Sequence, residues 1–145
     1  MEGEPSGSVR VPSSYDFIGK VILERKFEIT PEQLDSLEFY LVVYGANYSA
    51  EVWINGDFIA NHVGGYTSFV RSIPRGVLRI GSENVIAVTV SNELSAERTI
   101  PFRPGAWGWR NYGGLIRDVF LLGVPKFSLR RVLVRSRLST SMTSV

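Results

Sequence analysis

The fold is decided by the stretch Glu51-Val-Trp-Ile-Asn-Gly-Asp-Phe-Ile-Ala-Asn-His-Val-Gly-Gly-Tyr-Thr-Ser-Phe69. Val52 and Ile54 fall on one face of its first part and Trp53 on the other, which is the two-residue period of a half-buried strand. The stretch predicts three short strands, separated by a tight turn and by a glycine bend.

Two turn signals divide this stretch. Asn55-Gly56 suits a type I′ turn, because both central positions of that turn need positive φ. Phe58 and Ala60 then resume the alternation, so we expect them to share a face. Gly64-Gly65 allows the backbone to bend or to approach another group closely. We therefore expect a β-hairpin followed by a bend into the next strand.

The rest of the chain continues the same pattern. Alternating or apolar runs predict further strands at 20–29, 38–44, 84–90, 115–122 and 129–134. Thr30-Pro31 has a helix cap and a first-turn proline, and it predicts a single helical turn. About eight short strands without a long helix indicate a sandwich or barrel of antiparallel sheets. Periodicity alone leaves a jelly roll and an immunoglobulin sandwich both open.

Composition sets the limits of this interpretation. The chain has 145 residues, 44% of them hydrophobic and 12% aromatic, which indicates one packed globular domain. It has no cysteine, which excludes disulfides, thiol catalysis and cysteine-bound metals. The net charge is only +2, and the late arginines flank apolar residues, so we expect no nucleic-acid partner.

Targeting and domain limits are predicted from local composition. No apolar run is long enough to span a membrane, and the first residues lack the features of a signal peptide. We expect a cytoplasmic protein without a membrane partner. The predicted organisation is a flexible lead-in at 1–14, one domain at 15–135, and a tail or start of a linker at 136–145.

Two motifs carry a family resemblance. They are Val52-Trp-Ile-Asn-Gly, continued by His62-Val-Gly-Gly-Tyr-Thr-Ser-Phe69, and Asn111-Tyr-Gly-Gly-Leu-Ile-Arg-Asp-Val-Phe-Leu121. Together with weaker matches at 15–20 and 81–90, they resemble the N-terminal domain of family 2 glycoside hydrolases, the family of β-galactosidases, β-glucuronidases and β-mannosidases. The resemblance implies a jelly-roll β-sandwich of the galactose-binding-domain type.

The resemblance also implies what the chain lacks. A glycosidase needs two carboxyl groups, and in family 2 both glutamates lie in a separate (β/α)₈ barrel. This chain has neither the length nor the pattern of that barrel. Asn92-Glu93 is similar to the family's acid/base motif, but it follows the strand at 84–90 and we expect a solvated turn there. We therefore expect a non-catalytic sugar-binding domain, with a β-glycoside and the catalytic barrel as partners.

The candidate site is the loop that precedes the second motif. Sugars present C–H faces and hydroxyls, so their sites combine aromatic rings with hydrogen-bonding side chains. The loop supplies both kinds of group, in Trp107, Trp109, Arg110, Asn111 and Tyr112. Glucuronidase-type relatives carry an acidic residue three positions before the Asn-Tyr pair, where this chain has Gly108, so that particular role is in doubt.

Several alternatives stay open. The two tryptophans can instead pack against the barrel, and the chain can be a stand-alone carbohydrate-binding module or a structural module that self-associates as a homo-oligomer.

We expect no cofactor and no metal site, because no cluster of calcium-ligating residues is visible. We expect His62 to make a structural hydrogen bond. Arg117 and Asp118 are neighbours on an expected strand, so their side chains should point to opposite faces. We expect Arg117 to stack on an aromatic ring or to donate hydrogen bonds to loop carbonyls.

Overall fold

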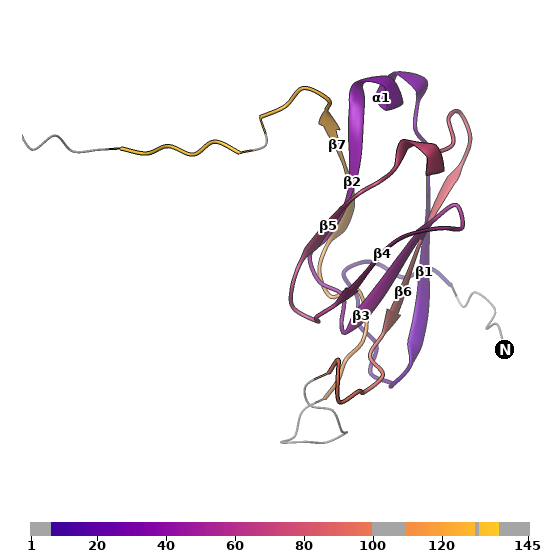
Figure 1. Cartoon of the computed structure of the whole chain (residues 1–145). Coiled ribbons are helices and arrows are strands. Elements are labelled where there is room, and N and C mark those ends of the chain that lie inside the picture. The colour runs from indigo at the N-terminus through magenta and orange to yellow at the C-terminus, as the bar shows by residue number, and fades with distance from the viewer. Residues whose placement is uncertain (1–6, 100–109, 130, 137–145) are drawn as a thin grey trace, which may run out of the picture.

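The computed structural model describes residues 7–99, 110–129 and 131–136, and these form two antiparallel β-sheets (Figure 1). One sheet has the order β1-β6-β3-β4 and the other the order β5-β2-β7. The strands are β1 (Lys20–Phe27), β2 (Leu37–Val43), β3 (Ser49–Ile54), β4 (Asp57–Val63), β5 (Phe69–Ser72), β6 (Asn84–Ser91) and β7 (Val119–Pro125). Two short helices, α1 (Pro31–Ser36) and η1 (Arg75–Val77), complete the described elements. The predicted all-β sandwich is confirmed.

The core lies between the two sheets. β2 contributes the buried residues Leu41 and Val43, and β3 contributes Val52 and Ile54, as the alternation predicts. Each such side chain contributes about 1.5–3 kcal/mol of hydrophobic free energy when it is fully buried. These two strands, one from each sheet, therefore contribute much of the apolar contact that holds the sheets together.

The β3–β4 hairpin confirms the predicted turn and corrects one detail. Asn55 has φ 54° and Gly56 has φ 91°, so both positions are left-handed as a type I′ turn requires. Val52 pairs with Ala60, whereas Trp53 pairs with Phe58, which leaves one extra residue as a β-bulge. The expectation that Phe58 and Ala60 share a face was wrong, because the bulge turns Phe58 outward, where it is 52% exposed against Trp53.

The predicted helical turn is present as α1. The Thr30 hydroxyl accepts a hydrogen bond from the Gln33 backbone N–H at 3.2 Å, and the Gln33 side chain accepts one from the Thr30 N–H at 3.0 Å. This capping box satisfies two N–H groups that a helix start otherwise leaves without partners. The cap therefore fixes where the chain turns from β1 into β2.

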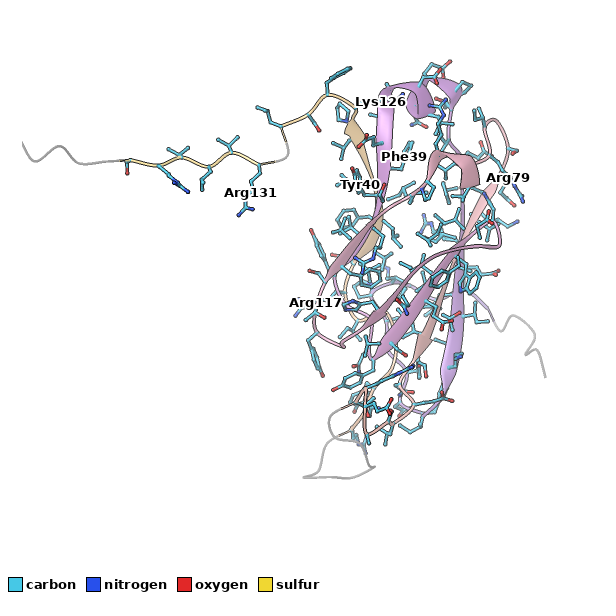
Figure 2. All side chains as sticks on the ribbon, in the orientation of Figure 1. Phe39, Tyr40, Arg79, Arg117, Lys126 and Arg131 are labelled. Atoms are coloured by element: carbon cyan, nitrogen blue, oxygen red, sulfur yellow. The ribbon has the colours of Figure 1, made fainter. Side chains whose placement is uncertain are left out.

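The predicted strand at 129–134 was wrong for its described residues. Leu129 and residues 131–136 form no strand, and the apolar side chains are exposed, Leu129 by 90% and Val134 by 84%. Figures 1 and 2 show this segment, with Arg131, running away from both sheets. Alternation favours an extended backbone, but a strand also needs a neighbouring backbone to pair with. The predicted domain limits stay a prediction.

Candidate functional site

The candidate loop joins the end of the sandwich beyond β6. Trp107 and Trp109 lie outside the described residues, and Arg110, Asn111 and Tyr112 are the part of the predicted site that the structure places. Figure 1 shows the described residues on both sides of this loop at the lower end of the molecule.

Asn111 is held by Asn92 at the end of β6. The Asn92 side-chain amide donates to the Asn111 carbonyl at 2.7 Å, and the Asn111 side-chain amide donates to the Asn92 carbonyl at 2.6 Å. The Asn111 amide nitrogen is thus engaged within the fold. The Asn111 side-chain oxygen is buried and has no hydrogen-bond partner among the described residues.

Asn92 also ties in the N-terminal segment. Its side-chain oxygen accepts from the Gly19 N–H at 2.8 Å, and its side-chain amide also donates to the Phe17 carbonyl at 2.8 Å. Asn92 is 0% exposed, so the expected solvated turn was wrong at this residue. Glu93 is exposed and accepts a hydrogen bond from the Ser91 hydroxyl at 3.2 Å. These bonds give the Asn92-Glu93 pair a structural role.

A second clamp follows immediately, at Gly113. Tyr15 and Gly113 exchange two backbone hydrogen bonds, at 2.8 and 2.9 Å. A Cβ at Gly113 would lie 2.1 Å from Cζ of Tyr15, so only glycine lets the ring pack here. The Tyr15 hydroxyl donates toward the Gly19 and Val90 carbonyls at 3.1 and 3.2 Å. Burial raises the pKa of Tyr15 to about 12, because the anion is disfavoured there.

Asn47 supplies the third contact at the base of the loop. Its backbone N–H donates to the Gly114 carbonyl at 2.9 Å, and the Gly114 N–H donates back at 3.2 Å. The Asn47 side-chain amide also donates to the Tyr112 carbonyl. Three parts of the framework therefore hold the 111–114 segment, which gives the candidate loop a rigid base.

Arg110 and Tyr112 remain available above this base. The Arg110 guanidinium donates a hydrogen bond to the Tyr112 side chain, and this bond, the charge interaction with Tyr112 and nearby Asp16 raise the pKa of Arg110. Arg110 is exposed, and Tyr112 is 42% exposed. A guanidinium beside an aromatic ring offers both the donor and the apolar surface that a sugar uses.

The glycine bend and the only histidine form a structural unit. His62 Nε2 lies 2.9 Å from the Thr67 hydroxyl, and the imidazole stacks on Phe69 with ring centres 4.5 Å apart. The predicted structural hydrogen bond of His62 is therefore confirmed. A Cβ at Gly65 would lie 2.0 Å from the Asn47 side-chain oxygen, so the bend packs directly on the base of the loop.

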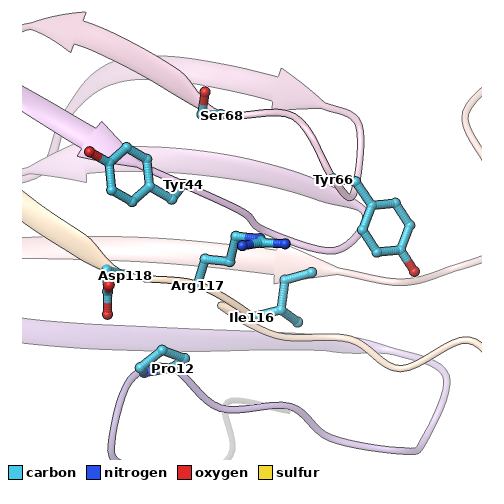
Figure 3. A pocket seen from close by; sticks show the side chains of 7 residues that line it. All are labelled: Pro12, Tyr44, Tyr66, Ser68, Ile116, Arg117 and Asp118. Carbon is cyan, nitrogen blue, oxygen red and sulfur yellow. The ribbon is translucent and has the colours of Figure 1, made fainter.

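Sequence reasoning missed an open groove of about 510 Å³ beside this base (Figure 3). It is lined by Pro12, Tyr44, Tyr66, Ser68, Ile116, Arg117 and Asp118. Arg117 and Asp118 both line it. Because β7 begins only at Val119, strand alternation does not fix their faces, and the expectation that they point to opposite faces stays a prediction. Among the described residues, Arg117 makes neither an aromatic contact nor a hydrogen bond to a loop carbonyl. Tyr66 and Ser68 belong to the first family motif and Ile116 to the second, but neither motif shows that these residues meet with Pro12 and Tyr44.

The part of the chain that the structure describes has no group of three His, Asp or Glu side chains able to hold a metal ion. Within the same residues, no helix has the length and apolar character needed to cross a membrane.

Comparison with known proteins relates this chain to parts of β-galactosidases and β-glucuronidases. The family model of the beta-galactosidase second all-beta domain matches residues 4–95. A β-glucuronidase of Paenibacillus borealis is 34% identical over 137 residues, covering 77% of this chain and 23% of that protein. A solved family 2 glycosyl hydrolase member from Bacteroides cellulosilyticus DSM 14838 is 29% identical with TM-score 0.61, covering 75% of this chain and 13% of that one.

A β-D-glucuronidase structure from Dictyoglomus thermophilum shares the fold at 24% identity, with TM-score 0.71 over 86% of this chain and 26% of that one. The chain spans only 12% to 24% of the length of the curated relatives that it matches.

Proposed function

The chain belongs to the family of the beta-galactosidase second all-beta domain, and from the motifs at 52–69 and 111–121 we propose that it is the non-catalytic, N-terminal sugar-binding domain of a larger family 2 β-glycosidase. In this proposal the fold is a jelly roll, and hydrolysis of the O-glycosidic bond takes place in a barrel domain elsewhere in the parent enzyme. The match to glycosidases over a small share of their length supports this division of labour.

The observation that carries the sugar-binding role is the rigid base of the candidate loop. Asn92 and Asn47 hold Asn111 and the Tyr112 carbonyl, so the segment that follows Trp107 and Trp109 is fixed to the sandwich. A fixed base reduces the entropy lost when a loop binds a ligand. Trp107 and Trp109 would supply the stacking surface of the site, and Arg110 and Tyr112 the polar groups.

The test of this role is an NMR titration of the chain with methyl β-glycosides of galactose, glucuronic acid and mannose. Trp53 serves as an internal control, because it lies on the outer face of the four-stranded sheet beside Phe58. We expect saturable shifts of the Trp107 and Trp109 indole N–H signals and none at Trp53. Equal shifts at all three, or none at concentrations on the order of tens of millimolar, would contradict the proposal.

Absence of catalysis is tested separately, with para-nitrophenyl β-galactoside and β-glucuronide. We expect the chain alone to release no nitrophenol above the buffer rate. Release that depends on protein concentration and is lost in Glu93→Gln would contradict the non-catalytic role.

The exposed apolar segment after β7 favours a second, compatible function as a contact surface for the parent enzyme. Phe127 is 98% exposed, Leu129 90% and Val134 84%. Large apolar side chains that are exposed together often mark a surface that binds a partner. In this reading the segment packs against a neighbouring domain of the same enzyme, and deletion of residues 127–136 should leave sugar binding unchanged.

A further inference from the structure

The groove beside the loop base is built on fixed backbone. The Tyr44 N–H donates to the Asp118 carbonyl at 3.0 Å, and the Ile116 N–H donates to the Gly45 carbonyl at 3.1 Å. A Cβ at Gly45 would lie 3.3 Å from the Arg117 side-chain carbons, so the Arg117 stem rests against this glycine. The end of β2 therefore sets the position of the arginine.

Of the two tyrosines that flank the groove, Tyr44 has its ring anchored and Tyr66 has its backbone held. The Tyr44 ring meets Phe120 edge-on, with ring centres 5.3 Å apart. Tyr66 follows the glycine bend, where the Gly64 N–H donates to the Tyr48 carbonyl at 2.9 Å and the Thr67 hydroxyl to the Gly64 carbonyl at 3.3 Å. A ring that is packed like Tyr44 costs little conformational entropy when a ligand binds, and the held bend limits where Tyr66 can reach.

The tyrosine rings in the groove are exposed, and the Arg117 guanidinium has no ion-pair partner among the described residues. Tyr44 is 46% exposed and Tyr66 60% exposed, and Figure 3 shows the Arg117 side chain between them. Among the described residues Arg117 takes part in no ion pair, although two other cations do, Lys26 with Glu83 and Arg75 with Asp35. The groove thus offers two apolar ring faces around an unpaired guanidinium.

The mixture of groups selects the ligand class. Asp118 lines the same groove as Arg117, and its negative charge disfavours a multiply charged anion such as a phosphate. A purely apolar ligand would leave the guanidinium and the carboxylate without partners. A neutral sugar ring fits both, because its C–H face can lie on tyrosine and its hydroxyls can accept from Arg117 and donate to Asp118.

We propose that this groove is a second carbohydrate subsite, which binds one neutral pyranose unit between Tyr44 and Tyr66 with Arg117 and Asp118 holding its hydroxyls. The volume of about 510 Å³ lies within the range of small-molecule sites. The choice of a sugar as ligand rests on the proposed function. The position of the subsite does not depend on Trp107 or Trp109.

The experiment is a heteronuclear NMR titration of the full chain with lactose and with methyl β-galactopyranoside. The reporters are the backbone amides of Tyr66, Ser68 and Asp118 and the Arg117 side-chain N–H. We expect saturable shifts at these groups, and a loss of affinity of about tenfold or more in Tyr66→Ala and in Arg117→Ala. Both residues are exposed, so neither variant should unfold the chain.

Two matched variants serve as controls. Phe58→Ala removes an aromatic ring that is exposed on β4, and Arg71→Ala removes an exposed arginine of β5 beside Phe69. Both should leave the shifts and the affinity unchanged. No saturable shift at the groove in the wild-type chain, or equal losses in the controls, would overturn the subsite.

Trp107→Ala separates this inference from the proposed function. If it abolishes binding at the loop while the groove still titrates, both stand. If it abolishes all binding and the groove variants bind like the wild type, the loop site stands and the subsite is refuted. If only the groove responds, in the wild type and in Trp107→Ala alike, the subsite stands and the loop role is refuted. A glucuronate titration tests the neutral-ligand choice, because tighter binding of the anion would contradict it.

Discussion

Asn92 and Asn111 exchange two hydrogen bonds, each side-chain amide donating to the other residue's backbone carbonyl, at 2.7 and 2.6 Å. The pair joins the end of β6 to the segment that leads into Gly113. Because Asn92 is fully buried and also binds Gly19 and Phe17, it connects three separate parts of the chain. The stability of this end of the sandwich should therefore depend on a single amide.

Asn92→Ala should lower the free energy of unfolding by about 3 kcal/mol, since it leaves several buried polar groups without partners. Urea unfolding followed by fluorescence measures the change. Asn61→Ala, at an exposed position of β4, is the matched control and should change the free energy by less than about 0.5 kcal/mol. Equal effects of the two substitutions would show that the Asn92 contacts contribute little.

Gly65→Ala should destabilise the chain by about 2–3 kcal/mol, because the new Cβ would overlap the Asn47 side-chain oxygen and force the bend away from the loop base. Gly76→Ala is the control, since a Cβ there meets nothing within 4 Å. Thermal unfolding of the two variants should differ clearly. A Gly65→Ala variant as stable as Gly76→Ala would refute the close packing.

Asn55 combines a turn conformation with a side-chain network, and substitution can separate the two. Its amide donates to the Val77 carbonyl at 2.7 Å and to the Asn84 side chain at 2.8 Å, and its side-chain oxygen accepts from the Val85 N–H at 3.0 Å. Asn55→Gly keeps the positive φ but removes these bonds, so it should cost about 2 kcal/mol in urea unfolding. An Asn55→Gly variant with the same free energy of unfolding as the wild type would mean that only the turn conformation, and not the side-chain network, contributes to stability.

The raised pKa of Tyr15 leads us to expect that the free energy of unfolding falls at alkaline pH. Its folded pKa of about 12 lies above the ordinary value of 10.0, so the stability it contributes is present below about pH 10 and is lost as the pH rises toward 12. Tyr15→Phe should be less stable by about 1 kcal/mol at neutral pH, where it lacks the hydroxyl's bonds. The difference in free energy of unfolding between Tyr15→Phe and the wild type, measured by urea unfolding, should shrink as the pH rises from about 10 to about 12. A difference that stays constant over this range would contradict the buried phenol.

Local patterns predicted the parts of this fold that depend on neighbouring residues. The Asn55-Gly56 turn and the single turn after Thr30 follow from local backbone preferences, and both are confirmed. The bulge before Ala60 was missed, because Phe58 and Ala60 keep the two-residue spacing of a regular strand in the sequence although the bulge lies between them. The strand expected at 129–134 was wrong, because alternation contains no information about a pairing partner.

The candidate site was only partly predictable for a related reason. Asn92 resembles a polar loop residue in sequence, and its burial results from contacts with Phe17 and Asn111, which are far away along the chain. The groove brings Tyr44, Tyr66 and Arg117 together from three separate segments. A motif search examines one segment at a time and does not register such a site.

The most direct test of the central claim, sugar binding by the candidate loop, is the dissociation constant of the chain for its best methyl β-glycoside by titration calorimetry. The wild type and a Trp107→Ala, Trp109→Ala double variant are compared at equal concentration. We predict binding in the millimolar to micromolar range, roughly 4–8 kcal/mol, weakened about tenfold or more in the double variant. Identical constants in the two proteins, or no heat of binding in the wild type, would contradict the account.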